Sequence, residues 1–358
     1  MRRKPCIVVH AGAGYHSKSK EHLYNSLCFE ACRYAMATLS NNGSAVDGAA
    51  AAVSYLEDSA LTNSGYGSCL TQNGRVECDS GIMCGKSLRF AAVGAVSAVR
   101  NPILVAKLLL QEQLNCPKTK LGRVHPALLC GNGAVEWLAS KSPSLAQPFN
   151  LVSEKAYSDW LKYRSWLDKV EARVIDTRET PHKRARTITM DTVGAVCVDL
   201  HGSVASAVSS GGIALKQEGR IGQASVYGCG CWAEENDFGK VAVVTSGTGE
   251  QLIRTQLAQR SSEKLLSSQN STTPDILKSV LIEGFLESRF LTTDDHRYAG
   301  LAGLLCTDAS LVEIFFGHTT KSMSIGYFVD GAMDLPKTFV SRKSNGTPLC
   351  ISAFSHRL

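Results

Sequence analysis

Apolar residues recur along the first part of the chain with two different periods. Residues 6–9 form a short apolar run that leads into the glycine-containing segment 11–14, so we predict a strand followed by a loop. Residues 21–39 carry apolar side chains at helical spacing, and Asn-Asn-Gly follows as a stop signal. Ser44 is suited to cap a second, alanine-rich helix that extends to about Glu57. The pattern therefore predicts alternating strands and helices.

The same alternation continues until the composition changes near residue 140. Strand-like runs lie around residues 74–78 and 90–99, and Asn101-Pro102 opens a further helix, because proline suits the first helical turn. From about residue 140 to 191, Pro, Ser and charged residues dominate, although residues 156–174 also match a charged helix. A polar stretch of this length indicates a functional loop or a linker. We expect a mobile linker.

Two apolar strands joined by a short turn follow the polar stretch. Residues 192–198 and 203–209 alternate as strands, and Asp199-Leu200-His201-Gly202 has the composition of a hairpin turn. Antiparallel pairing around this turn places Ser210 directly opposite Thr192, where the two side chains share a face. A bulge at the glycine of the turn would shift the register by one residue and separate them.

Composition is that of a globular protein with a sizeable core. The chain has 358 residues, of which 44% are hydrophobic and 20% charged. No apolar run reaches the roughly 18 residues of a membrane span, and the first apolar run is too short for a signal-peptide core. The 13 cysteines are odd in number and lack a regular framework or a Cys-x-x-Cys pair. This usage favours a reducing compartment and does not indicate a metal site.

Charge adds one local feature. The net charge of +6 is mild, and the aromatic and basic residues do not interleave as they do in single-strand nucleic-acid binders. The linker contains the run Lys183-Arg184-Ala185-Arg186. We interpret it as a nuclear-import signal whose basic side chains Lys183, Arg184 and Arg186 bind an import receptor; the alternative is a solvated loop that presents a cleavage site. We expect the protein in the nucleus and cytoplasm, without membrane or direct nucleic-acid binding.

Thr192 is the candidate nucleophile, because it opens a strand directly after the polar stretch. A threonine hydroxyl needs a base beside it, and the residue's own α-amine, with a pKa of roughly 7.7–8.0, is such a base. That amine exists only if the chain is cut between Asp191 and Thr192. We therefore predict a zymogen that cleaves itself and thereby creates its catalytic group, with no organic cofactor.

Two later segments supply complementary chemistry. Arg220 presents a planar guanidinium that suits a carboxylate. Residues 244–250, Val-Thr-Ser-Gly-Thr-Gly-Glu, follow a strand-like run and precede a helix. Their glycines leave backbone N–H groups open, as an oxyanion hole requires. The pattern would also suit a phosphate nest, although the lysine of a P-loop is absent.

Together these segments resemble the threonine-nucleophile asparaginases of the N-terminal-nucleophile hydrolase superfamily. The resemblance rests on five motifs: His10-Ala11-Gly12-Ala13-Gly14, Asn63-Ser64-Gly65-Tyr66-Gly67-Ser68, Asp79-Ser80-Gly81-Ile82-Met83, Thr192-Val193-Gly194-Ala195-Val196 and Arg220-Ile221-Gly222. Within the family the chain is most similar to the threonine aspartase (taspase) branch, through its His-Ala-Gly-Ala-Gly-Tyr-His, Ser-Ser-Gly-Gly, Gly-Arg-Ile-Gly-Gln-Ala and Tyr-Gly-Cys-Gly-Cys-Trp-Ala-Glu segments.

The resemblance implies a fold and a set of site residues. The fold is a mixed α/β four-layer αββα sandwich, in which an α chain (1–191, with the linker over about 140–191) and a β chain (192–358) form one folded heterodimer that pairs into α2β2. The implied roles are autocleavage at Asp191 and Thr192 with help from Asn63, an acyl-enzyme on Thr192, Ser210 in place of a second active-site threonine, oxyanion stabilisation by Ser246 and Gly247, and substrate contacts from Arg220 and Gly249.

Gln223 distinguishes the possible substrates. Free asparagine and a peptide aspartate both place a carboxylate two carbons from the scissile carbonyl, so Arg220 suits either. Asparaginases hold the substrate ammonium with an aspartate three residues after the arginine, where this chain has Gln223. A neutral glutamine gives up a charge-assisted contact worth roughly 1.5–3 kcal/mol but can serve a peptide amide. We therefore expect cleavage of protein substrates after aspartate.

The resemblance further implies substrates with an aspartate–glycine bond in nuclear regulators, such as trithorax-type methyltransferases and a general transcription factor subunit. Two alternatives stay open. One is a small-molecule L-asparaginase or β-aspartyl peptidase with the same nucleophile, and the other is a non-catalytic nuclear adaptor.

Overall fold

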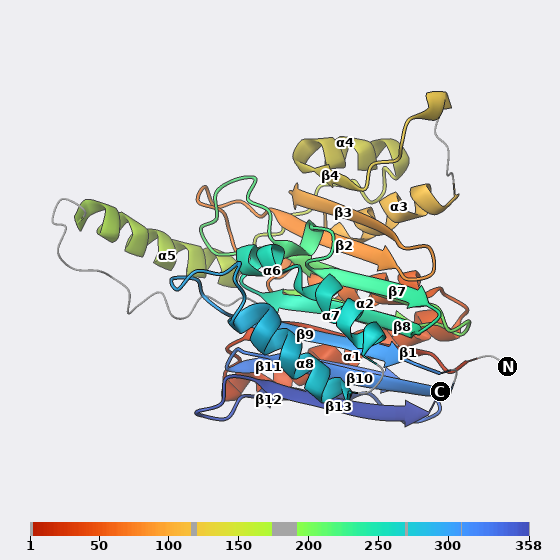
Figure 1. Cartoon of the computed structure of the whole chain (residues 1–358). Helices are drawn as coiled ribbons and strands as arrows, with labels where there is room; N and C mark the ends of the chain where they lie inside the picture. The colour runs from red at the N-terminus through yellow and green to blue at the C-terminus, as the bar shows by residue number, and fades with distance from the viewer. Residues whose placement is uncertain (1–2, 116–119, 174–191, 269–270, 309, 358) are drawn as a thin grey trace.

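Two β-sheets lie face to face, with helices on both outer sides (Figure 1). The computed structural model describes residues 3–115, 120–173, 192–268, 271–308 and 310–357. Over these residues the larger sheet has eight strands, in the order β12 (Lys337–Arg342), β11 (Ser322–Val329), β1 (Cys6–Gly14), β5 (Val193–Val198), β6 (Val204–Ser210), β2 (Cys78–Cys84), β3 (Arg89–Val96) and β4 (Leu128–Cys130). The smaller sheet has five, in the order β13 (Cys350–Arg357), β10 (Leu311–His318), β9 (Ala299–Cys306), β8 (Gly239–Gly247) and β7 (Cys231–Asn236).

Helices complete the four layers. The helices are α1 (Glu21–Ser40), α2 (Ala45–Glu57), α3 (Pro102–Asn115), α4 (Gly131–Lys141), α5 (Glu154–Arg173), α6 (Gly249–Thr255), α7 (Leu257–Ser267) and α8 (Thr273–Leu281). The first three pack on the larger sheet, and α7 and α8 pack on the smaller one. This confirms the αββα sandwich expected from the sequence.

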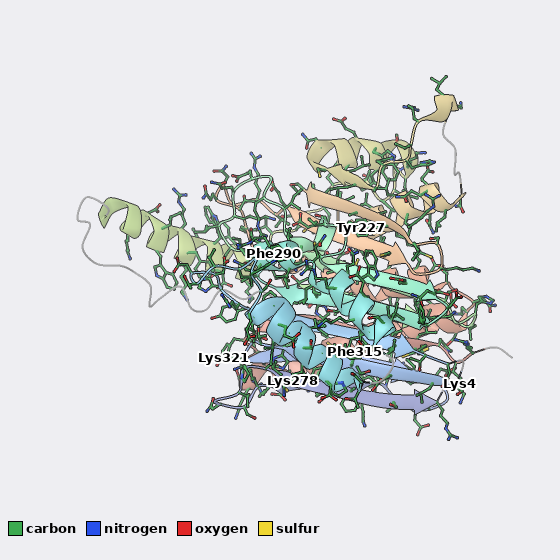
Figure 2. All side chains as sticks on the ribbon, viewed as in Figure 1. Lys4, Tyr227, Lys278, Phe290, Phe315 and Lys321 are labelled. Carbon is green, nitrogen blue, oxygen red and sulfur yellow. The ribbon has the colours of Figure 1, made fainter. Side chains whose placement is uncertain are left out.

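Apolar side chains fill the space between adjacent layers. Ala195 and Val196 are neighbours on β5, and they point to opposite faces of the sheet. Ala195 packs with Leu39 in the layer under α1 and α2, whereas Val196 packs with Val244 between the two sheets. Phe315, fully buried, lies in the layer between the smaller sheet and α8 (Figure 2). β5 is buried on both faces, and its sequence is continuously apolar.

Local signals account for the start of α2. The Ser44 hydroxyl accepts a hydrogen bond from the Asp47 N–H (3.2 Å), and the Asp47 carboxylate accepts one from the Ser44 N–H (3.0 Å). This capping box satisfies two backbone donors at the helix terminus. The predicted helix from Ser44 to about Glu57 is therefore confirmed.

Two predicted strand boundaries are wrong, and one helix was not predicted. β1 continues through the predicted loop to Gly14, because β11 pairs with it on both sides of an irregularity after His10. β2 begins at Cys78, where the predicted strand ends, because the Thr71 N–H and the Arg75 carbonyl close a turn instead. α4 had no prediction in the sequence.

The hairpin of β5 and β6 has the predicted register. Val193 pairs with Ser209 and Val198 with Val204, without a shift between them. No bulge therefore intervenes, and Ser210 comes next to Thr192. The hairpin lies between β1 and β2, so strands from beyond the predicted cleavage site are flanked by strands from before it.

Part of the predicted linker is helical. The beginning of α5 packs on the body of the protein, where the Trp160 indole N–H donates to the Thr71 carbonyl (3.0 Å) and Ala156 is buried. The rest of α5 projects from the body (Figure 1). Across the described part of the chain, the helices are too short or too polar to cross a membrane.

Candidate active site

The hydroxyl of Thr192 contacts two of the predicted site residues. Thr192 immediately precedes β5, and only 3% of it is exposed. Its Oγ1 donates a hydrogen bond to Ser210 Oγ (3.0 Å), and Gln223 Nε2 donates one to Thr192 Oγ1 (3.3 Å). The predicted nucleophile therefore lies between a hydroxyl from β6 and an amide from the segment that carries Arg220.

Ser210 is held by the turn that follows β6. Its Oγ also accepts a hydrogen bond from the Gly212 N–H (3.1 Å), so both the nucleophile and the backbone donate to this oxygen. The amide of Asn63 donates to the Gly212 carbonyl (2.6 Å), and the Asn63 carbonyl accepts from the Gly211 N–H (2.8 Å). Asn63 is therefore linked to Ser210 and Thr192 through this turn.

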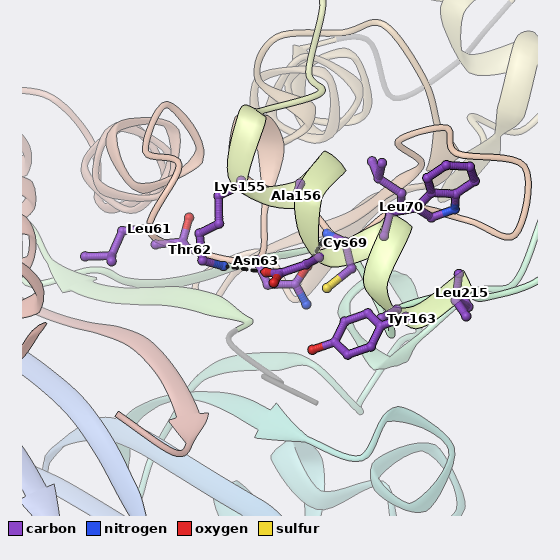
Figure 3. Close-up of a pocket in the computed structure, with 13 residues that line it drawn as sticks. Leu61, Thr62, Asn63, Cys69, Leu70, Lys155, Ala156, Tyr163 and Leu215 are labelled. Atoms are coloured by element: carbon purple, nitrogen blue, oxygen red, sulfur yellow. Dashed lines mark hydrogen bonds and ion pairs between the residues drawn. The ribbon is translucent and has the colours of Figure 1, made fainter. Parts of the chain in front are cut away.

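A pocket borders the site next to Asn63 (Figure 3). Asn63 and Cys69 line it from one side, and Ala156 and Tyr163 line it from α5. The Asn63 side-chain oxygen accepts a hydrogen bond from the Cys69 N–H (2.8 Å), which orders the loop at the pocket. Thr192 does not line this pocket.

Arg220 is paired with a carboxylate that sequence reasoning did not assign. Its Nε and Nη2 donate to the two carboxylate oxygens of Glu250 (2.8 and 2.7 Å). Glu250 lies in the first turn of α6, directly after Gly249, and its side chain is 52% exposed, whereas that of Arg220 is 14% exposed. Acidic residues are favoured in the first turn of a helix. The position of Glu250 at the start of a predicted helix was therefore the only sequence signal that drew attention to it.

Glycines surround the other side of the Arg220 guanidinium. A Cβ atom at Gly249 would lie 2.8 Å from Nη2, and one at Gly212 or Gly222 would lie 3.0 or 2.9 Å from Nη1. The Gly249 position is also 3.0 Å from the side-chain oxygen of Gln223. The absence of side chains at these positions lets the backbone approach Arg220 and Gln223 closely.

Asp79 holds the segment that carries Arg220. Its carboxylate accepts hydrogen bonds from the Gly222 N–H (2.8 Å) and the Ala95 N–H (2.9 Å). Burial raises the pKa of the Asp79 carboxyl, and the positive charges of Lys216 and Arg220 oppose that shift. The sequence analysis quoted Asp79 in a motif but predicted no function for it. An aspartate within an apolar strand is seldom buried without a partner, so its position already indicated a structural or functional role.

The predicted oxyanion pair lies at the end of β8. Ser246 is fully buried, and its Oγ accepts a hydrogen bond from the Ala13 N–H at the end of β1 (3.0 Å). Gly247 has a φ of +146°, and a Cβ there would collide with the Tyr298 carbonyl, so the position requires glycine. β1 also pairs with β5 beside Thr192, which brings Ser246 to the same end of the sandwich.

His10 lies behind the nucleophile strand. It is fully buried, and burial lowers the pKa of its imidazole to about 3, so the ring is neutral. Its Nδ1 accepts a hydrogen bond from the Gly12 N–H (3.3 Å). A Cβ at Gly194, which pairs with His10, would collide with the ring. The His10 ring therefore requires a glycine at residue 194 of β5. The sequence motif that contains His10 did not indicate this role.

Most predicted site residues converge, and a few fall outside the described residues. Direct contacts join Thr192, Ser210 and Gln223, while Arg220 and Gly249 lie beside Gln223. Asp191, Lys183, Arg184 and Arg186 lie outside the described residues.

Comparison with known proteins places this geometry in a family. The profile of the family described as asparaginase matches residues 3–278. This chain belongs to the asparaginase family. It is similar to the isoaspartyl peptidase/L-asparaginase of Homo sapiens, with 35% identity over 71% of this chain and 75% of the relative. It is also similar to the plant-type L-asparaginase of Pyrobaculum calidifontis, with 33% identity over 90% of this chain and 96% of the relative.

The family assignment settles the reaction class. A further relative is the isoaspartyl peptidase of Escherichia coli K12, with 33% identity over 70% of this chain and 74% of the relative. As an asparaginase-family member, this chain is a hydrolase of the N-terminal-nucleophile superfamily. The names of these relatives support the family and not the threonine aspartase branch within it.

Proposed function

We propose that this asparaginase-family chain is a self-processing threonine endopeptidase that cleaves protein substrates after aspartate. The proposal rests on one contact, in which the neutral amide of Gln223 donates to the hydroxyl of Thr192. The group that donates to the Thr192 hydroxyl is therefore an uncharged amide, which suits the amide of a peptide backbone better than a free ammonium.

The space next to Gln223 supports binding of a carboxylate. Nη1 and Nη2 of Arg220 lie beside the glycines at 212, 222 and 249, and the cationic side chain of Lys216 lies next to Gly212. A carboxylate held by these donors forms charge-assisted hydrogen bonds. The scissile carbonyl of a peptide aspartate lies two carbons from its carboxylate, so an anchored side chain would present that carbonyl toward Thr192.

Maturation follows from the same chemistry. Thr192 Oγ1 attacks the carbonyl carbon of Asp191, the C–N bond breaks, and the nitrogen takes a proton to become the free amine. Water then hydrolyses the resulting ester and releases the Asp191 carboxylate. Ser210, which already accepts the hydrogen bond of the hydroxyl, orients it for this step.

Turnover repeats the attack on a substrate. The Thr192 amine removes the hydroxyl proton as Oγ1 attacks the aspartyl carbonyl, and Ser246 with the Gly247 N–H stabilises the oxyanion. The leaving amine takes the proton, and water releases the acyl group. Arg220 holds the aspartate side chain throughout.

A second candidate is an isoaspartyl peptidase or L-asparaginase. The names of the relatives favour it over the first candidate, because the three relatives described above are peptidases or asparaginases of this kind. Residue 223 decides between the candidates, because a carboxylate there would restore the ammonium contact.

The test compares Gln223→Asp with the wild type on three substrates: a peptide with an internal aspartate–glycine bond, a β-aspartyl dipeptide and L-asparagine. We expect the wild type to cut the peptide, and the variant to lose peptide cleavage at least tenfold while gaining turnover of the small substrates. Gln217→Asp is the matched control, since Gln217 is exposed. A wild type that hydrolyses the small substrates and leaves the peptide intact would establish the second candidate.

A further inference from the structure

Arg220 uses one of its two hydrogen-bonding edges to bind the half-exposed Glu250, and glycines lie beside its other edge. We propose that Glu250 is a positioning residue that holds the guanidinium by the edge of Nε and Nη2, so that the edge of Nη1 and Nη2 (the outer edge) receives the substrate carboxylate. The inference rests on the proposed function, because it assumes that Arg220 binds this carboxylate.

The geometry separates the two edges. A guanidinium has five N–H donors, arranged as one fork of Nε with Nη2 and another of Nη1 with Nη2. Glu250 accepts from Nε and Nη2 (2.8 and 2.7 Å), so it occupies the first fork. Beside Nη1 and Nη2 lie the glycines at 212, 222 and 249 together with the cationic side chain of Lys216, whose Nζ is 3.2 Å from a Cβ at Gly212, so the second fork faces groups that do not compete for a carboxylate.

Two carboxylates can therefore bind the same arginine at once. If Glu250 blocked the site, it would have to occupy the edge that faces Gly249 and Gln223. Instead, it approaches from the side of Nε, which points away from the outer fork. The carboxylate of Glu250 is thus a fixed support and not a competitor of the substrate.

Glu250 is well placed to act as a support. It lies in the first turn of α6, where the positive end of the helix dipole favours a carboxylate. Two parallel hydrogen bonds fix both the plane and the rotation of the guanidinium. An unsupported arginine would sample several rotamers and would have to be ordered when the substrate binds, which weakens binding.

The experiment compares matured Glu250→Gln with the wild type on the substrate that the wild type turns over. Glutamine keeps the length of the side chain but has one acceptor in place of two. We expect KM to rise about tenfold, kcat to stay within about twofold, and the melting temperature to be unchanged. The matched control is Glu263→Gln on α7, whose carboxylate accepts from Gln259 (2.9 Å), and it should leave all three values unchanged.

Arg220→Lys separates failure of this inference from failure of the proposed function. Lysine keeps the charge but lacks the fork, so KM should rise in this variant as well. If KM rises for Arg220→Lys but not for Glu250→Gln, the positioning role is wrong and the proposed function stands. A lower KM for Glu250→Gln would show that Glu250 competes with the substrate, which also overturns the inference. Unchanged KM in both variants would overturn the role of Arg220 and the inference with it.

Discussion

Replacement of Gly249 by alanine tests the carboxylate space directly. The added Cβ would lie 2.8 Å from Arg220 Nη2, 3.0 Å from the Gln223 side-chain oxygen and 3.3 Å from the Gly222 Cα. It would therefore stand where the substrate carboxylate approaches the outer edge of the arginine. Loss of one charge-assisted hydrogen bond costs about 1.5–3 kcal/mol, which corresponds to a roughly ten- to hundredfold lower kcat/KM.

The fold should tolerate this change. Gly249 lacks a positive φ and is the first residue of α6, so alanine meets no backbone strain there. Two of the close atoms are the ends of flexible side chains, which can shift. The melting temperature of Gly249→Ala should therefore stay near that of the wild type, whereas activity falls.

The assay measures kcat and KM of the matured variant on the substrate that the wild type turns over. Gly133→Ala is the matched control, because a Cβ at Gly133 in α4 meets nothing within 4 Å. It should keep wild-type kinetics. An unchanged kcat/KM in Gly249→Ala would refute the placement of the substrate carboxylate between Arg220 and Gln223.

Three further predictions follow from the same structure. Thr192→Ala should remain a single uncut chain on a denaturing gel, whereas the wild type yields a fragment whose N-terminal sequence begins Thr-Val-Gly; a variant that still matures would contradict the mechanism. Ser210→Ala removes the acceptor of both Thr192 and the Gly212 N–H. Self-cleavage should slow at least tenfold and unfolding free energy should fall by about 1–3 kcal/mol in denaturant titration, and unchanged cleavage would rule out an orienting role. Burial raises the pKa of Glu57 from 4.5 to about 8, so the folded state holds the proton more tightly than the unfolded state and stability is lost as pH rises from about 4.5 to 8. Glu57→Gln should match the wild type near pH 4.5 but exceed it at pH 9 by up to about 5 kcal/mol, and parallel pH–stability curves would refute the assigned pKa.

The hairpin could be predicted from the sequence because neighbouring residues in the chain determine it. A short turn sets the register of the strands beside it, so the positions of Thr192 and Ser210 followed from a few residues of pattern. The capping box at Ser44 is likewise encoded within four residues. The family motifs then added Arg220, Ser246 and Gly249 to the predicted site residues. The contacts of these three residues cannot be predicted from the spacing of apolar positions.

Tertiary structure alone decided which residues support these groups. Ala13 and Ser246 are 233 residues apart, and Asp79 and Gly222 are 143 apart, so their hydrogen bonds depend on how the two sheets and their connections pack. The pairing of Arg220 with Glu250 also depends on tertiary packing. The hydrophobic pattern along the chain does not indicate which side chains come into contact when they lie 30 residues apart. The sequence by itself predicted the hairpin and Thr192 as the candidate nucleophile from short-range patterns, and the layered fold followed from the family resemblance. Packing determined the orientation of the arginine, the support beneath its loop and the close approach of three glycines to it, because those depend on distances between segments far apart in the chain.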